Sequence, residues 1–190
     1  MLTSFSFADA VVFGSRKPNI DYVERRAAYV VTIEAGNVAL VGSGRNRFLP
    51  GGGSLPAEAT EMTIAREVRE ELGWDVRLLH PVGAATQYFY SQDDDRHYEM
   101  LAVFVAGELT NRLANAVGEH SLEWLPIAQA TESCFHECHA WAIRQSNDMA
   151  QQLVGPERRE RVSHQARCGE GCVKSRRPVN SDVLPLNPFE

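Results

Sequence analysis

Apolar residues follow the two-residue spacing of a strand in some segments of the chain and the spacing of a helix in others. Ala27–Glu34 and Val38–Val41 are rich in apolar residues and flank the turn signal Gly36-Asn37, which predicts a β-hairpin. Further strands are predicted at Asp75–Leu79, Thr86–Ser91, Tyr98–Leu109 and Glu123–Leu125.

Two segments have helical spacing instead. In Thr60–Leu72 the side chains of Ile64 and Val68 fall on one apolar stripe, and Gly73 stands where a helix C-terminal glycine belongs. A second helix is expected within Ala128–Leu153. Strands interleaved with two helices predict an α/β sandwich built on a mixed sheet.

The pattern stops at residue 155. Residues 155–190 are rich in Arg, Gly, Ser and Pro and have no sustained period, so we expect one domain at 1–154, with its core at about 27–153, and a basic, disordered tail. No apolar run has the length of a membrane span. Four cysteines are too few for a disulfide scaffold and the N-terminus lacks a basic region, so we expect a cytoplasmic protein.

The charge of the chain narrows the classes of partner. The formal net charge is −6 over 190 residues; the acidic excess lies in 1–154, whereas 155–177 is basic. An acidic body argues against nucleic acid as the main partner, because phosphate contacts need a basic surface. It suits a site that concentrates divalent cations.

Three glutamates share one face of the predicted helix Thr60–Leu72. Glu67, Glu70 and Glu71 stand at i, i+3 and i+4, at the edge of the apolar stripe. Like charges so close together repel, and Mg²⁺ or Mn²⁺, which take oxygen ligands, would compensate them. For these three residues alone, the alternative is a solvated acidic face that Arg66 neutralises locally.

The residues before this helix favour phosphate chemistry. Gly51-Gly52-Gly53 can bring the backbone close to a phosphate because no Cβ obstructs it, and Glu58 adds a fourth carboxylate. A diphosphate repels a nucleophile by its negative charge. Metal ions held by carboxylates neutralise that charge and lower the pKa of bound water, and one more carboxylate can accept the proton.

The whole segment resembles a known motif at every defined position, G52-x5-E58-x7-R66-E67-V68-x-E70-E71-x-G73-W74. The motif is the Nudix box of the Nudix hydrolases, a family of MutT-like proteins, here at residues 52–74. Trp74 fills a position that is more often aliphatic, and Ala59-Thr60-Glu61 departs from the family's usual helix start, which leaves the N-cap open. The flanking pattern is similar to the Nudix fold, an α/β/α sandwich with a mixed β-sheet.

The resemblance implies Mg²⁺-dependent hydrolysis, with Mn²⁺ as the other metal, of a diphosphate linkage in a nucleoside diphosphate derivative or a (d)NTP. The implied metal ligands are Glu67, Glu70, Glu71 and the carbonyl of Gly51. Arg66 matches the arginine that orients the glutamates, Glu58 matches the loop carboxylate that pairs with it, and Gly52 is the box glycine. Arg66 and Glu70 are therefore expected to belong to the catalytic machinery.

The general base is expected outside the box in some members of the family, ahead of a Glu-Trp pair on a late strand. Glu119 has this position before Glu123-Trp124 and is our first candidate, with Glu123 second and Glu99 third. Glu119 as an ordinary loop acid is the competing interpretation. If none of these serves, the resemblance leaves Glu70 as the base.

Two other functions stay open at this point. One is a non-catalytic Nudix-fold module that senses a nucleotide, although such relatives usually lose box acids and none is lost here. The other is an RNA 5′-end pyrophosphohydrolase with residues 155–190 as an RNA clamp. The substrate and its binding residues are not assigned, because specificity lies in loops outside the box, and a homodimer stays open.

Several further groups have a structural and a functional interpretation. Plain thiols and core packing are favoured over zinc for the Cys and His residues near 134–139 and for Cys168 and Cys172. Solvated surface is favoured over phosphate contact for Arg25 and Arg26, and core packing over base stacking for Phe89 and its tyrosine neighbours.

Overall fold

The computed structural model describes residues 7–8, 10–43, 46–114 and 118–153. By its internal contacts the chain divides into Met1–Gln152 and Leu153–Glu190. The second unit lies outside the described residues apart from Leu153, and with it the expected tail at 155–190, Cys168 and Cys172. In the described part of the chain, no helix has both the length and the apolarity needed to cross a membrane.

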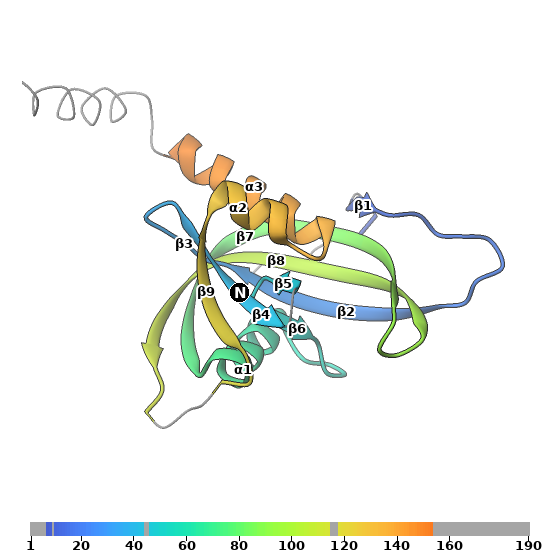
Figure 1. The fold of residues 1–190 in the computed structure, drawn as a ribbon, viewed down its shortest axis with the longest axis horizontal. Helices are drawn as coiled ribbons and strands as arrows, with labels where there is room; N and C mark the ends of the chain where they lie inside the picture. The colour runs from blue at the N-terminus through green and yellow to red at the C-terminus, as the bar shows by residue number, and fades with distance from the viewer. Residues whose placement is uncertain (1–6, 9, 44–45, 115–117, 154–190) are drawn as a thin grey trace, which may run out of the picture. The chain divides into compact units, whose positions relative to one another are not determined.

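The larger sheet is mixed, with five strands in the spatial order β1-β7-β8-β2-β6 (Figure 1). The strands are β1 (Val11–Phe13), β2 (Tyr22–Val31), β6 (Gly51–Gly53), β7 (Trp74–Ser91) and β8 (Arg96–Arg112). β1 is parallel to β7 and β2 is parallel to β8, whereas the β7–β8 and β2–β6 pairs are antiparallel. The predicted mixed sheet is confirmed.

The largest differences from the predicted strands of this sheet are in β7 and β2. Asp75–Leu79 and Thr86–Ser91 belong to one long strand, β7, whose pairing with β8 shifts register at three places, the last next to Pro81. A proline cannot donate a ladder hydrogen bond, and here it marks a bulge rather than the end of the strand. β2 begins at Tyr22 rather than at Ala27, so the Arg25–Arg26 pair belongs to a strand.

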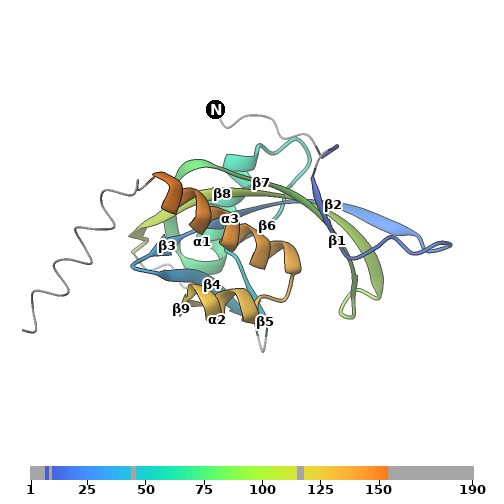
Figure 2. The same ribbon diagram turned by 90° about the horizontal axis from the view of Figure 1, so that it is seen from above.

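A smaller sheet lies beside the first (Figure 2). Its strands are β3 (Ile33–Glu34), β4 (Asn37–Ser43), β5 (Asn46–Phe48) and β9 (Ser121–Pro126). The predicted hairpin forms between β3 and β4, with Gly36 at a φ of 79° in its turn, but the predicted strand Ala27–Glu34 is divided, because its first part belongs to β2 in the larger sheet. β9 pairs with the other edge of β4 and places Trp124 opposite Ala39.

Helix α1 (Thr60–Leu72) has the predicted bounds and ends at Gly73, which adopts the left-handed conformation with a φ of 70°. Its N-cap residue, Ala59, makes no capping hydrogen bond through its side chain. The second predicted helix is wrong in one respect, because it is divided into α2 (Ile127–Ser133) and α3 (Glu137–Leu153).

The break between α2 and α3 has a tertiary cause. Cys134 is extended, with φ −62° and ψ 130°, and forms a parallel bridge with Arg47 next to β5. The N–H of Phe135 donates to the carbonyl of Arg47 over 2.9 Å. Pairing with β5 therefore interrupts a segment whose local spacing is helical throughout.

Alternate residues of β2 pack into two separate clusters on the two faces of the larger sheet. Val30 packs with Ile64 and Val68 of α1, whereas Tyr29 packs in the cluster that contains Ile143 of α3. Figure 1 shows α1 on one side of the strands and α2 and α3 on the other. This is the predicted α/β/α arrangement, with the smaller sheet on the α3 side.

Candidate active site

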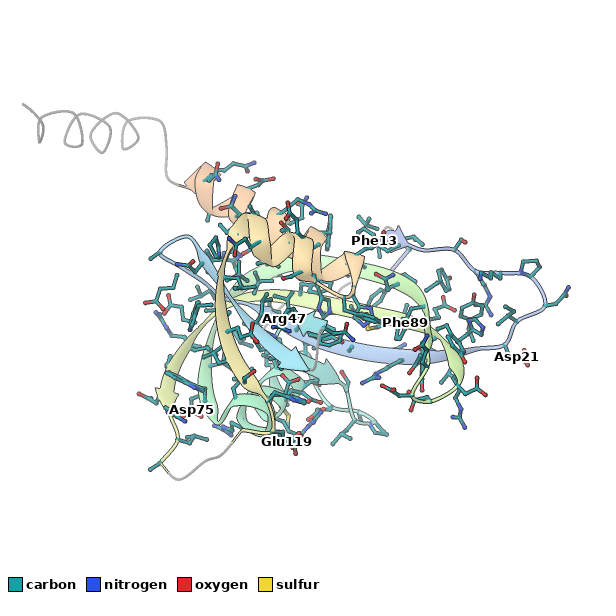
Figure 3. All side chains as sticks on the ribbon, in the orientation of Figure 1. Phe13, Asp21, Arg47, Asp75, Phe89 and Glu119 are labelled. Carbon is teal, nitrogen blue, oxygen red and sulfur yellow. The ribbon has the colours of Figure 1, made fainter. Side chains whose placement is uncertain are left out.

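A cleft of about 660 Å³ lies between the two sheets, and its lining changes from one end to the other. The glutamate end is lined by Gly51–Gly53, Glu67, Glu71 and His120. The aromatic end is lined by Phe48, Phe89, Phe135 and His136. Figure 3 shows Phe89 on β7 and Glu119 near α1, well apart from each other. The volume is in the range of small-molecule sites.

The side chain of Arg66 is hydrogen-bonded to β6, the glycine strand, to the loop before α1 and to the glutamates of α1. Its Nε and Nη2 donate to the two carboxylate oxygens of Glu58, each over 2.9 Å, and Nη2 also donates to the carbonyl of Gly53 over 2.8 Å. Its Nη1 donates to Glu67 over 2.8 Å and to Glu70 over 3.1 Å. The bonds from Arg66 hold the pKa of Glu58 at about 2, so this carboxylate stays ionised.

Glu71 is the buried member of the glutamate group. The N–H of Gly51 donates to its Oε2 over 2.9 Å. The pKa of Glu71 is raised to about 8, mainly by burial and also by the negative charges of Glu67, Glu119 and Glu70, against the lowering effect of the Gly51 N–H. Three other carboxylates therefore lie close enough to Glu71 to affect its pKa.

Glycine is required in β6 for geometric reasons. Gly51 has a φ of 132°, and a Cβ there would lie 2.3 Å from the carbonyl oxygen of Ala28. A Cβ on Gly52 would lie between 2.7 and 2.9 Å from the carboxyl atoms of Glu67. The backbone of β6 thus passes directly beside the acidic face of α1.

A short loop places Glu119 at the end of α1. The N–H groups of Glu119 and His120 donate to the carbonyls of Glu70 and Glu71 over 3.1 and 3.0 Å. A Cβ on Gly118 would lie 2.3 Å from the carbonyl oxygen of Glu71, so the loop packs tightly on the helix. These bonds satisfy two carbonyls that a helix terminus otherwise leaves free, and they bring the Glu119 charge near Glu71.

The two lower-ranked base candidates have other partners. Glu123, on β9, accepts from Nε of Arg47 over 2.6 Å. Glu99, on β8, accepts from Arg16 over 2.6 Å and from the hydroxyl of Tyr88 over 2.9 Å. None of the three candidate carboxylates lines the cleft itself. Of the three candidates, Glu119 is the one whose charge acts on Glu71.

The glutamate end fits a divalent cation by the chemistry of its donors. All of them are oxygen atoms, and their mutual repulsion already raises the pKa of Glu71. In the residues that the structure describes, Arg66 and the Gly51 N–H occupy these oxygens, and no three His, Cys, Asp or Glu side chains converge as a ready-made metal site. A cation would therefore compete with Arg66 for Glu67 and Glu70.

The Cys and His residues near 134–139 belong to the core side of the cleft. Burial raises the pKa of Cys134 and of Cys138 to about 12 each, which disfavours the thiolate. The ring of His139 is buried, and its Nδ1 accepts from the N–H of Leu49 over 3.1 Å. His136 lies in the aromatic end. Within the described ranges these groups form no zinc-type cluster.

The cleft also contains residues that the sequence did not single out as a site. Arg25 is exposed, as predicted, and it also lines the cleft, as do His120 and Phe135. The sequence spacing could have placed Arg25 at the cleft. Arg25, Ala27 and Tyr29 are alternate residues, so they share one face of the strand once β2 is extended to include Arg25. The aromatic rings come from separate segments, and no spacing links them.

A family model described as the NUDIX domain matches residues 23–145, and the chain belongs to this family. Nudix hydrolases act on small nucleotide substrates and generally use divalent metal ions. No curated protein matches the sequence.

Two solved structures are similar to this chain in fold. A NUDIX hydrolase from Nitrosomonas europaea has a TM-score of 0.55 at 15% identity, over 66% of this chain and 90% of that one. A MutT protein from Methanosarcina mazei Go1 has a TM-score of 0.53 at 17% identity, over 68% of this chain and 98% of that one. At these identities the likeness shows the fold, and the site has to be argued from its own residues.

Proposed function

We propose that this protein is a Mg²⁺-dependent hydrolase of a diphosphate linkage in a nucleoside diphosphate derivative or a (d)NTP. The observation that carries the proposal is the convergence of Glu67, Glu71 and the backbone of Gly51–Gly53 on one end of a single cleft, with Glu119 near enough to act on Glu71. A nucleotide-sensing module would not need every acid of the box.

Glu67, Glu70, Glu71 and the carbonyl of Gly51 would hold the metal, and Mn²⁺ can replace Mg²⁺ there. When bound, the metal neutralises the diphosphate and lowers the pKa of the attacking water. The glycines of β6 leave room for phosphate oxygens beside the helix, since no Cβ stands between the two.

The residues of this chain hold the geometry and move the proton. The paired bonds between Arg66 and Glu58 fix the loop against α1, which positions Glu67 and Glu70. Glu119 accepts the proton of the water whose oxygen attacks phosphorus, with Glu70 as the alternative base. A P–O bond of the diphosphate bridge breaks, and the product is two phosphorylated fragments.

The test is a chromatographic screen for the phosphorylated products that the full chain forms with Mg²⁺ or with EDTA. The substrates are dNTPs, ADP-ribose, dinucleoside polyphosphates, NADH, nucleotide sugars and an RNA with a 5′-triphosphate. Cleavage of at least one nucleotide that EDTA abolishes and Glu70→Gln reduces is the expected result. Nucleotide binding without cleavage of any substrate would replace the proposal by a sensing module, and cleavage of the RNA alone would replace it by RNA 5′-end processing.

A further inference from the structure

The aromatic end of the cleft is built around one imidazole. The ring of His136 lies 4.7 Å from that of Phe89, 4.9 Å from that of Phe135 and 5.6 Å from that of Phe48, measured between centroids. All of these contacts are tilted or edge-on rather than stacked face to face. Phe89 is also stacked on Tyr98, with 5.4 Å between the centroids, so one of its faces is covered, whereas the half-exposed ring of Phe135 is accessible to a ligand.

Phe135 is exposed in an unusual place. Half of its surface is accessible although its neighbour His136 is buried. The exposure does not come from a loose loop, because the Phe135 N–H is bonded to the carbonyl of Arg47 between α2 and α3. The backbone therefore fixes a large apolar ring at the mouth of a cleft, where a ligand can cover it.

The three phenylalanines and His136 form an uncharged surface, although Asp93, in the turn after β7, also lines the cleft. Burial lowers the pKa of His136 to about 4, so the imidazole is neutral near pH 7. Phe48, Phe89 and Phe135 have no titratable group. A flat, uncharged, aromatic group suits such a lining, and the phosphates of a nucleotide do not.

Arg25 connects the two ends of the cleft. A Cβ on Gly53 would lie 3.4 Å from Nε and Nη2 of Arg25, which places the guanidinium against β6. Its positive charge also acts on His136 and Tyr29. Arg26, the next residue of β2, lies on the opposite face and pairs with Glu24 over 3.2 Å, whereas Arg25 has no carboxylate partner in the described part of the chain.

We propose that the aromatic end binds the nucleobase of the substrate, stacked on Phe135 and against Phe89, and that Arg25 binds the phosphate nearest the nucleoside. The proposal rests on the function proposed above and adds the direction of the substrate. The base lies at the α2–α3 break and the scissile diphosphate lies over β6. A nucleotide that spans the cleft needs a positive side chain near the phosphate next to its nucleoside. The guanidinium of Arg25 has this position, because it lies between the glycines of β6 and the aromatic end and has no acidic partner among the residues described.

The test is calorimetric binding to the full chain in Mg²⁺ buffer. The ligands are the α,β-methylene analogues of ADP, GDP, CDP and UDP, which resist hydrolysis between their phosphates, and methylenediphosphonate, which has no base. At least one analogue is expected to bind at least about 10-fold more tightly than methylenediphosphonate, a difference typical of one stacked base. Phe135→Ala should remove most of that difference and leave methylenediphosphonate binding unchanged.

Arg25→Ala should weaken the binding of the nucleotide analogue by about 10-fold, since it removes a charge-assisted contact to phosphate. The matched control is Arg26→Ala, on the other face of the same strand, and Trp124→Ala is the control for an exposed aromatic ring outside the cleft. Both controls should bind as the unchanged protein does. If Phe135→Ala does not fold, Phe135→Leu keeps an apolar side chain and still removes the ring.

The result that overturns the inference is equal binding of methylenediphosphonate and every nucleotide analogue, or base-dependent binding that Phe135→Ala and Phe135→Leu leave intact. Failure of the proposed hydrolysis looks different. Base-dependent binding would then persist while the substrate screen shows no cleavage. Conversely, metal-dependent cleavage together with base-independent binding would contradict this inference alone.

Discussion

At the glutamate end of the cleft, four carboxylates lie near the glycine strand, whereas at the aromatic end three phenylalanines surround an imidazole. Each end contains a buried titratable group whose neutral form is favoured, but the shifts have opposite signs. Burial raises the pKa of Glu71 to about 8 and lowers that of His136 to about 4. At the glutamate end the negative charges outnumber the positive ones, whereas at the aromatic end burial disfavours the charged form of His136.

This difference explains how one cleft can accommodate both parts of a nucleotide. Like charges held together by the fold store repulsion that a cation relieves, so the glutamate end is suited to metal and phosphate. The aromatic end gains from removing apolar surface from water. Variants that change one end should therefore leave the other end working, and the predictions below test that independence.

The largest effect is expected for Glu71→Gln. The change keeps the shape of the side chain but removes the carboxylate that would bind the metal in its ionised form, so turnover should fall by at least about 10²-fold, or about 2.7 kcal/mol of transition-state stabilisation. Folding should be kept or improved, because repulsion from Glu67 and Glu70 decreases. Steady-state kinetics and denaturant unfolding check both parts, with Glu132→Gln as an exposed control on α2. Near-normal turnover would remove Glu71 from the metal-binding set.

The next effect is expected for Glu119→Gln, which should lower kcat by about 10-fold or more with little change in KM, because the bond to the attacking water matures in the transition state. The loop itself should stay in place, since it is attached by the backbone N–H groups of Glu119 and His120 rather than by the carboxylate. The measurement is kcat and KM with the substrate that the screen identifies. A rise in KM at constant kcat would make Glu119 a binding residue instead.

The elements that could be predicted are those whose signals are local. The bounds of α1 follow from its apolar stripe and from Gly73, whose left-handed conformation ends the helix. The glutamate face follows in the same way, because helix geometry alone places Glu67 and Glu71 on one side. The proximity of Glu119 to this face depended on the family resemblance, since nothing local relates the loop to the helix.

The elements that could not be predicted depend on contacts between distant segments. The α2–α3 break exists because Phe135 pairs with Arg47, a residue of the smaller sheet, and helix spacing continues across it. The aromatic end combines β5, β7 and that break. Arg25 is exposed, as predicted, but its place beside the cleft was missed because the predicted strand began too late, at Ala27.

The pH dependence of the free energy of unfolding gives a further test of the aromatic end. The folded protein favours neutral His136, by burial first and then by the charge of Arg25, so its contribution to stability is complete above the ordinary pKa of about 6.5 and is lost as the pH falls toward about 4. From about pH 7 to about pH 5.5, His136 alone should cost about 1 kcal/mol of unfolding free energy. His139, also shifted down by burial, acts in the same direction.

The measurement for this prediction is denaturant unfolding at both pH values for the unchanged protein and for His136→Gln. Because Glu71, with its raised pKa, acts in the opposite direction over this range in both proteins, the comparison is of the difference between them, which should change by about 1 kcal/mol between the two pH values. The control is His97→Gln, whose ring contacts Tyr22 and Tyr90 away from His136. An unchanged slope in His136→Gln would show that the imidazole is not held neutral by the fold.

The smallest effect on catalysis is expected for Glu123→Gln. Its carboxylate is bonded to Arg47 over 2.6 Å, and both side chains are less than a third exposed, so the loss should appear as about 1 kcal/mol of stability. Because Glu123 is paired with Arg47 and is not among the charges that act on Glu71, kcat should stay within about 3-fold of the unchanged protein. A severe loss of kcat in Glu123→Gln beside a mild one in Glu119→Gln would move the base to Glu123. If neither variant lowers kcat, the base lies within the box, and Glu70, half exposed on α1 and bonded to Arg66, becomes the residue to test.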